Sequence, residues 1–263
     1  MKIAILAAGD SKYFPVIIDK PKSLYHLNGE IQLRRVIETA KKFVVEEDII
    51  IVAGYKANLM RKYVKENYPK IDFRVNERYK EPAVYSFRKA VDGIDDDVVF
   101  MFADESISEK NVRRISESKR SMSILCHDTF YYYSLGILKL SKKYIHIFDD
   151  DNYLSMEYMK DVYCFANNKK EYDGAFTIDS GICIGYMIID IVRRIGKIQK
   201  VENPIETYKG EDIDFLHYCP EKEYIADLDS IRDTDEYKNN WLLRFYSDHI
   251  SNRLRRIIEL LKK

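Results

Sequence analysis

The chain has 263 residues, of which 46% are hydrophobic, so it can bury a sizeable core and is not disordered throughout. Its 43 lysines and arginines balance 43 aspartates and glutamates, so the formal net charge is zero and no overall basic field points to nucleic acid as a partner. The length suits one large α/β domain, or one such domain with a sizeable insertion.

Cysteine spacing and hydropathy indicate where the protein works. The four cysteines show no C-x-x-C spacing, which is typical of free thiols in a reducing compartment. No apolar run approaches the roughly 20 residues of a membrane-spanning helix, and the first residues lack a signal-peptide pattern. We therefore expect a cytoplasmic protein without stable membrane insertion.

The first two dozen residues combine a strand with a loop suited to phosphate. An apolar run over residues 3–8 predicts a buried central strand, and Gly9 ends it before a polar loop. A loop of small residues lets backbone N–H groups approach a ligand without side-chain obstruction. Lys22, in a Pro-Lys-Ser-Leu segment, can reach back over this loop as a point charge for phosphate.

Helices and strands then alternate along the chain, with a tight turn expected at Asn28-Gly29. The predicted elements are helices over residues 31–43, 59–64 and 109–118, a helix from about residue 85, and strands over 48–53, 72–75, 97–102 and 121–126. This order indicates a Rossmann-like, mostly parallel sheet with helices on both faces.

The regular alternation stops near residue 128. We interpret residues 128–174 as an insertion on the acceptor side, which shapes the pocket for a second substrate. A last strand is expected over 223–228 and a C-terminal helix over 237–261. The apolar stripe of that helix favours core packing, with a homodimer interface or a membrane-surface role as alternatives.

Several short motifs, taken in chain order, resemble those of the sugar-phosphate and phosphocholine nucleotidyltransferases. They are Leu6-Ala7-Ala8-Gly9, Pro21-Lys22-Ser23-Leu24, Gly54-Tyr55, Asn76-Glu77-Arg78-Tyr79, Ala103-Asp104, Asp179-Ser180-Gly181 and Asp229-Ser230-Ile231-Arg232-Asp233. The first motif departs from the family pattern, because Ser11 stands where a second glycine is usual and Tyr13 where an arginine is usual. The resemblance extends over most of the chain, and it implies the nucleotide-diphospho-sugar transferase type of fold in a single domain.

The resemblance also implies an activity. It points to a Mg²⁺-dependent cytidylyltransferase-like enzyme that transfers a nucleoside monophosphate, with CTP favoured as donor, to a small phosphocholine-like or sugar phosphate and releases pyrophosphate. It places Asp104 and Asp229 on the metal and Lys22 on the α-phosphate. Magnesium prefers hard oxygen ligands such as these carboxylates. The products of such enzymes usually feed the decoration of cell-surface glycans or lipids.

The expected nucleotide-binding residues come from the first loop, the lysine segment and the start of the helix near residue 85. They are Leu6, Ala7, Ala8, Gly9, Ser11, Lys12, Tyr13, Lys22, Glu81, Ala83 and Ser86. Since a phenol cannot grip phosphate bidentately as a guanidinium does, Lys12 is the candidate cation in place of the missing arginine. A solvated loop lysine is the alternative for Lys12.

Other interpretations stay open. Asp104 also suits a helix cap, Lys22 an ordinary surface lysine, and Asp227 competes with Asp229 because it projects to the same face of a strand. The acidic triplet at 149–151 is either a solvated turn or the metal site of a glycosyltransferase that uses a nucleotide-sugar. The tyrosines at 131–133 suit packing or a cage for a quaternary ammonium. A nucleotide-binding protein without activity is the remaining alternative.

Overall fold

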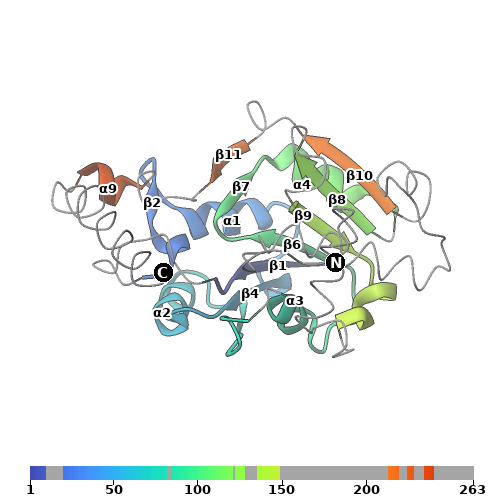
Figure 1. The fold of residues 1–263 in the computed structure, drawn as a ribbon, viewed down its shortest axis with the longest axis horizontal. Helices are drawn as coiled ribbons and strands as arrows, with labels where there is room; N and C mark the ends of the chain where they lie inside the picture. Colours follow the sequence, from blue (N-terminus) through green and yellow to red (C-terminus); the bar gives the residue numbers. More distant parts are fainter. Residues whose placement is uncertain are drawn as a thin grey trace, which may run out of the picture.

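The computed structural model describes residues 1–9, 20–81, 84–120, 122–127, 135–148, 213–218, 224–227 and 234–239. Within these residues the chain forms a seven-stranded sheet in the order β10-β8-β9-β6-β1-β4-β5 (Figure 1). The strands are β1 (Lys2–Ala7), β4 (Ile49–Ala53), β5 (Asp72–Val75), β6 (Val98–Phe102), β8 (Met122–His127), β9 (Leu135–Leu140) and β10 (Ile213–Tyr218). All pairings are parallel except those of β9, which runs antiparallel to β6 and β8, so the predicted mostly parallel sheet is confirmed.

The centre of the sheet is β1, which pairs with β4 on one side and β6 on the other. Ile3, Ala4 and Ile5 have no exposed surface, and all five residues of β4 are buried. Strands that are apolar on both faces need a layer of helices on each face. The motifs at the ends of these strands are therefore attached to a sheet that is packed on both faces.

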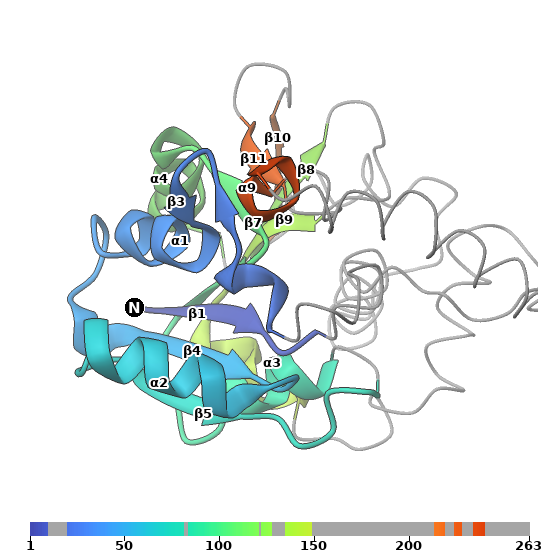
Figure 2. The same ribbon diagram turned by 90° about the vertical axis from the view of Figure 1, so that its left-hand side faces the viewer.

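Helices cover both faces. They are α1 (Gln32–Ala40), α2 (Ala57–Asn67), α3 (Val84–Val91) and α4 (Glu109–Glu117). Apolar residues of α1, α2 and α4 share one core cluster with Ile3 and Ile5. On the opposite face, Phe87 of α3 packs against Phe100 of β6 and against Phe148 of the short helix η3 (Lys142–Phe148). Figure 2 shows α1 and α4 on one side of β1 and α3 on the other.

The Asn-Gly turn predicted from the sequence connects β2 (His26–Leu27) to β3 (Glu30–Ile31). Asn28 and Gly29 have φ values of 53° and 82°, the left-handed conformation that a two-residue hairpin turn requires. Their N–H groups donate to the Asp235 carboxylate at 3.2 and 2.5 Å. Asp235 begins the short helix α9 (Asp235–Asn239), so a late part of the chain holds this early turn.

Of the expected insertion at 128–174, the structure describes β9 and η3. β9 lies in the sheet between β6 and β8, with Ile137, Leu138 and Leu140 fully buried. Lys139 interrupts this apolar run, but its ammonium group donates to the carbonyls of Ser116 and Ser118 at the end of α4. A buried lysine satisfied in this way is compatible with a core strand, although it masks the strand in the sequence. Residues 149–174 lie outside the described parts of the chain.

The late strand expected over 223–228 also differs in its partner. β11 (Tyr224–Asp227) is present, but it pairs antiparallel with β7 (Glu105–Ile107) in a separate two-stranded ribbon and not with the main sheet. The helix expected over 237–261 lies outside the described residues apart from residues 237–239, which end α9. No helix that the structure describes is long and apolar enough to cross a membrane.

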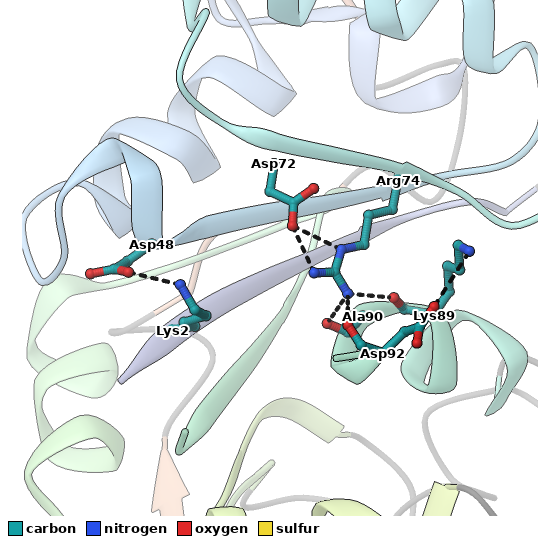
Figure 3. A network of polar contacts seen from close by, with 7 residues as sticks. All are labelled: Lys2, Asp48, Asp72, Arg74, Lys89, Ala90 and Asp92. Carbon is teal, nitrogen blue, oxygen red and sulfur yellow. Dashed lines mark hydrogen bonds and ion pairs between the residues drawn. The ribbon is translucent and has the colours of Figure 1, made fainter. Parts of the chain in front are cut away.

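A buried arginine joins β5 to the end of α3 (Figure 3). Arg74 donates from Nη1 to the carbonyls of Lys89, Ala90 and Asp92 at 3.0, 3.1 and 2.8 Å, and its Nη2 pairs with Asp72 at 2.7 Å. Only 15% of the arginine side chain is exposed. The guanidinium thus satisfies carbonyls that the last turn of a helix leaves unpaired.

We expect Arg74→Met to lower the free energy of unfolding by about 1.5–3 kcal/mol, because charge-assisted hydrogen bonds to buried carbonyls are lost. Urea unfolding measures the change. The control is Arg113→Met, which removes an ion pair to Glu117 from a side chain that is 58% exposed and should cost less than about 1 kcal/mol. Equal losses in the two variants would contradict the role assigned to Arg74.

Candidate functional site

The end of β1 and the residue that follows it are hydrogen-bonded to the segments after both neighbouring strands. The Ala103 N–H donates to the Leu6 carbonyl, and the Tyr55 N–H donates to the Ala8 carbonyl, each at 3.0 Å. Leu6 and Ala8 are buried, whereas Gly9 is exposed. The carboxyl ends of β1, β4 and β6 are therefore joined by backbone contacts at one edge of the sheet, where open α/β sheets bind ligands.

Gly54 explains how closely these segments approach one another. A β-carbon at this position would lie 2.7 Å from the Ala8 carbonyl oxygen and 2.4 Å from the Tyr79 β-carbon. Backbone atoms cannot move aside as the end of a flexible side chain can, so only glycine fits between the first loop and the segment after β5.

Asn76 organises the entry to α3. Its N–H donates to the Ala53 carbonyl at 2.8 Å, and its side-chain amide donates to the Ser86 hydroxyl at 3.0 Å. The side-chain oxygen accepts the Arg78 N–H at 2.9 Å. Ser86 was predicted to contact nucleotide, and in the structure its hydroxyl accepts this buried hydrogen bond from Asn76. The role of Asn76 was missed, although an asparagine directly after a strand is a known turn former.

Glu81, the next predicted residue, is exposed and paired with Arg78. Hydrogen bonds from the Arg78 guanidinium hold the pKa of the Glu81 carboxyl below its ordinary value. The guanidinium also lies 3.6 Å from the centre of the Tyr85 ring and donates to the Tyr85 hydroxyl at 2.7 Å. Arg78, Glu81 and Tyr85 thus form a cation–aromatic cluster at the start of α3, which we call the rim.

Lys22 and Asp104 meet at the other side of the first loop. Lys22 begins the short helix η1 (Lys22–Leu24), and Asp104 lies two residues beyond the end of β6. Their side chains form an ion pair between Nζ and Oδ2, with 28% and 22% of the side chains exposed. The two side chains therefore touch directly in this structure. Two opposite, half-buried charges offset part of each other's desolvation.

The second expected metal ligand, Asp229, lies outside the described residues. The ribbon of β7 and β11 nevertheless pairs Asp227 with Glu105, the residue that follows Asp104. The chain leading to Asp229 thus runs beside the segment that carries Asp104. Within the described residues there is no group of three or more His, Cys, Asp or Glu side chains that could hold a metal ion.

The predicted residues divide into those that the structure describes and those that it does not. The first group consists of Leu6, Ala7, Ala8, Gly9, Lys22, Glu81, Ser86 and Asp104, of which the ion pair brings Lys22 and Asp104 together. The residues outside the described ranges are Ser11, Lys12, Tyr13, Ala83 and Asp229. The acidic triplet at 149–151 and the tyrosines at 131–133 also lie outside them.

We expect Gly54→Ala to destabilise the protein by about 1–3 kcal/mol, because the added methyl group must displace backbone. Gly9→Ala is the matched control, since a β-carbon there would meet no atom within 4 Å. Thermal unfolding of both variants measures the difference. An unchanged midpoint in Gly54→Ala would contradict the close packing of the three segments.

Comparison with known proteins shows what this part of the chain is similar to. Residues 3–123 match the family model of the MobA-like NTP transferase domain. A comparison with proteins of curated function gives no match.

Three solved structures illustrate the shared fold. The inositol-1-phosphate CTP transferase from T. maritima is 12% identical, with a TM-score of 0.56 over 94% of this chain and 96% of that one. The CTP:phosphocholine cytidylyltransferase from Streptococcus pneumoniae is 17% identical, with a TM-score of 0.53 over 90% and 96%. A putative glucose-1-phosphate thymidylyltransferase from Bacillus anthracis is 13% identical, with a TM-score of 0.54 over 92% and 95%.

At these identities the structural similarity concerns the fold, and the family match concerns residues 3–123, which include Lys22 and Asp104. The resemblance and the fold predicted from the sequence are both confirmed. Residues 3–123 thus resemble the MobA-like NTP transferase domain, and the chain shares the fold of these solved nucleotidyltransferases.

Proposed function

We propose that the protein is a Mg²⁺-dependent nucleotidyltransferase that transfers a nucleoside monophosphate, from CTP in preference, to a small phosphorylated acceptor and releases pyrophosphate. The observation that carries this proposal is the meeting of Lys22 and Asp104 beside the loop after β1. A cation for phosphate and an oxygen ligand for metal are thereby placed together at the ligand-binding edge of a parallel sheet.

Asp104 fits magnesium by its chemistry and position. Its carboxylate is a hard oxygen donor that is 22% exposed. Magnesium usually takes one or two protein carboxylates and completes its shell with phosphate oxygens and water, so a three-carboxylate cluster is not needed. The pairing of Asp227 with Glu105 supports Asp229 as the second ligand. When bound, the metal would orient the triphosphate and neutralise part of its charge.

The protein groups in this reaction position the substrates and neutralise charge. A phosphate nucleophile is already ionised, so no general base is required, and rate comes from alignment and electrostatic stabilisation. Lys22 moves from Asp104 to an oxygen of the α-phosphate and stabilises the charge that grows there. The backbone around Ala7 and Ala8 reads the edge of the base, because these side chains are too small to do so.

The remaining nucleotide contacts come from three segments. Ser11, Lys12 and Tyr13 face the triphosphate, with Lys12 supplying the positive charge. Ala83 lines the base side, and the rim formed by Arg78 and Glu81 borders it. The buried hydrogen bond between Asn76 and Ser86 supports a role for Ser86 in shaping this side of the site.

The names of the structural neighbours support the choice of substrates. Two of the three neighbours described above are named for CTP, and their acceptors are phosphocholine and inositol 1-phosphate. We therefore place a phosphocholine-like compound or a sugar phosphate in the acceptor site, with residues 149–174 shaping it and the C-terminal helix closing the domain or forming a homodimer contact. The product would serve the decoration of cell-surface glycans or lipids in a cytoplasmic step. No contact among the described residues favours a glycosyltransferase instead.

A pyrophosphate-release screen tests the function directly. We expect release when CTP, but not the other three nucleoside triphosphates to the same extent, is incubated with Mg²⁺ and a panel of choline, amino-alcohol, polyol and sugar phosphates. Asp104→Asn should lower turnover by about 100-fold or more, because an oxygen ligand for the metal loses its charge. Asp95→Asn, at a side chain that is 92% exposed, is the control and should turn over normally. Full activity in Asp104→Asn would show that another residue holds the metal.

The contact between Lys22 and Asp104 predicts opposite effects on metal binding and on catalysis. Lys22→Met should tighten Mn²⁺ binding by about 2- to 5-fold, because the competing ion pair is gone, while turnover falls. Electron paramagnetic resonance of free Mn²⁺ gives the binding constant without nucleotide. Lys42→Met, which removes an exposed ion pair to Glu109, should change neither quantity. Weaker Mn²⁺ binding in Lys22→Met would rule out this competition.

A further inference from the structure

A fully buried glutamine is hydrogen-bonded to the backbone of the two segments that carry the charged groups of the site. Gln32 is the first residue of α1 and has no exposed surface. Its main-chain N–H donates to the Tyr25 carbonyl at 3.0 Å, and its side-chain Nε2 donates to the main-chain carbonyl of Asp104 at 3.1 Å. One residue thus holds the backbone of both the lysine segment and the aspartate segment.

These contacts close a ring. The Tyr25 N–H donates to the Lys22 carbonyl at 3.1 Å, and the ion pair from Lys22 to Asp104 completes the circuit. Tyr25 is fully buried, and α1 packs against both η1 and β7, the elements that begin at Lys22 and directly after Asp104 (Figure 1). Every link except the ion pair involves backbone, so the ring constrains where the two side chains start.

The residue type is informative because an apolar side chain is the usual occupant of a fully buried position on a helix. Burying a primary amide is unfavourable unless it is hydrogen-bonded, and neighbouring α1 residues such as Leu33 and Val36 are apolar and buried. A glutamine at this place is best explained by what its amide holds, which is the carbonyl of Asp104.

We propose that Gln32 is a positioning residue of the nucleotidyl transfer site. By holding the peptide that follows Asp104 and the turn that follows Lys22, it fixes the distance and direction between the carboxylate and the ammonium group. This inference rests on the proposed function, in which Asp104 binds metal and Lys22 contacts the α-phosphate. It extends that function to a residue that belongs to none of the motifs in the sequence.

Removing the Gln32 amide should misalign Asp104 and Lys22 while leaving both of these groups in the protein. A carboxylate that swings out of place binds metal less well, and a small misplacement of reacting groups lowers the rate of a reaction that depends on positioning. The base side of the site, on β1 and β4, does not depend on Gln32. The change should therefore affect metal binding and kcat more than the KM for CTP.

The test compares two variants that each lose a buried donor to a backbone carbonyl. Gln32→Met removes the amide at nearly constant volume. Lys139→Met removes an ammonium group that is 6% exposed and donates to α4 carbonyls away from the site. Mn²⁺ binding without nucleotide, pyrophosphate release and thermal unfolding are measured for both. If Gln32→Met does not fold, Gln32→Leu replaces it.

We expect Gln32→Met to weaken Mn²⁺ binding by about 3- to 10-fold and to lower kcat, while Lys139→Met lowers only the unfolding temperature. In an Asp104→Asn background, Gln32→Met should weaken Mn²⁺ binding no further. Metal binding and kcat that match the wild type or Lys139→Met would overturn the role of Gln32 alone. A wild-type protein that neither binds Mn²⁺ nor releases pyrophosphate would overturn the proposed function, and this inference with it.

Discussion

The pairing of β1 with β4 and β6 is the constraint on which the rest of the structure depends. Because these strands are parallel and buried on both faces, their carboxyl ends meet at one edge, and the segments that leave them are joined by backbone hydrogen bonds. The ladder continues beyond the strands themselves, through the Leu6 and Ala8 carbonyls. The residues that directly follow β1, β4 and β6 are thereby held together, and Gly54 supplies the space for this approach.

The charges of the site follow from that arrangement. Asp104 extends from β6 and Lys22 from the segment after the first loop, so two groups from distant parts of the sequence meet at half-buried positions. Neither charge is strongly desolvated. Lys22 can exchange the Asp104 carboxylate for a phosphate, and Asp104 can exchange the Lys22 ammonium group for a metal cation. A site for an anionic nucleotide needs this property, since a deeply buried ion pair would be too costly to open.

Much of the frame was predictable because it depends on local patterns. The apolar runs of β1 and β4, the helical spacing in α1 and the Asn-Gly turn each carry their signal within a few residues. β9 was missed because Lys139 breaks its apolar run, and the carbonyls that satisfy this lysine belong to α4. The partner of β11 was missed because strand pairing is set by tertiary contacts, which the sequence pattern of one strand does not contain.

The same distinction applies to the site. Lys22 and Asp104 were identified from motifs. Asn76 and Arg78 also stand in a motif, but it did not reveal their roles, and Gln32 belongs to no motif, since each of these residues acts through a neighbour. A glutamine in a helix usually lies on the solvated side. Only its burial and its partner reveal that it belongs to the site.

The contact between Asp235 and the β2–β3 turn has a consequence for the order in which the protein assembles. It joins residues that are 206 and 207 positions apart, so the loop that it closes is almost as long as the chain. Synthesis at about 5–20 residues per second leaves the hairpin waiting at least ten seconds or so before its partner exists. Until Asp235 is synthesised, the turn has only its own Asn-Gly geometry to favour it, and the contact with the carboxylate can be added only afterwards.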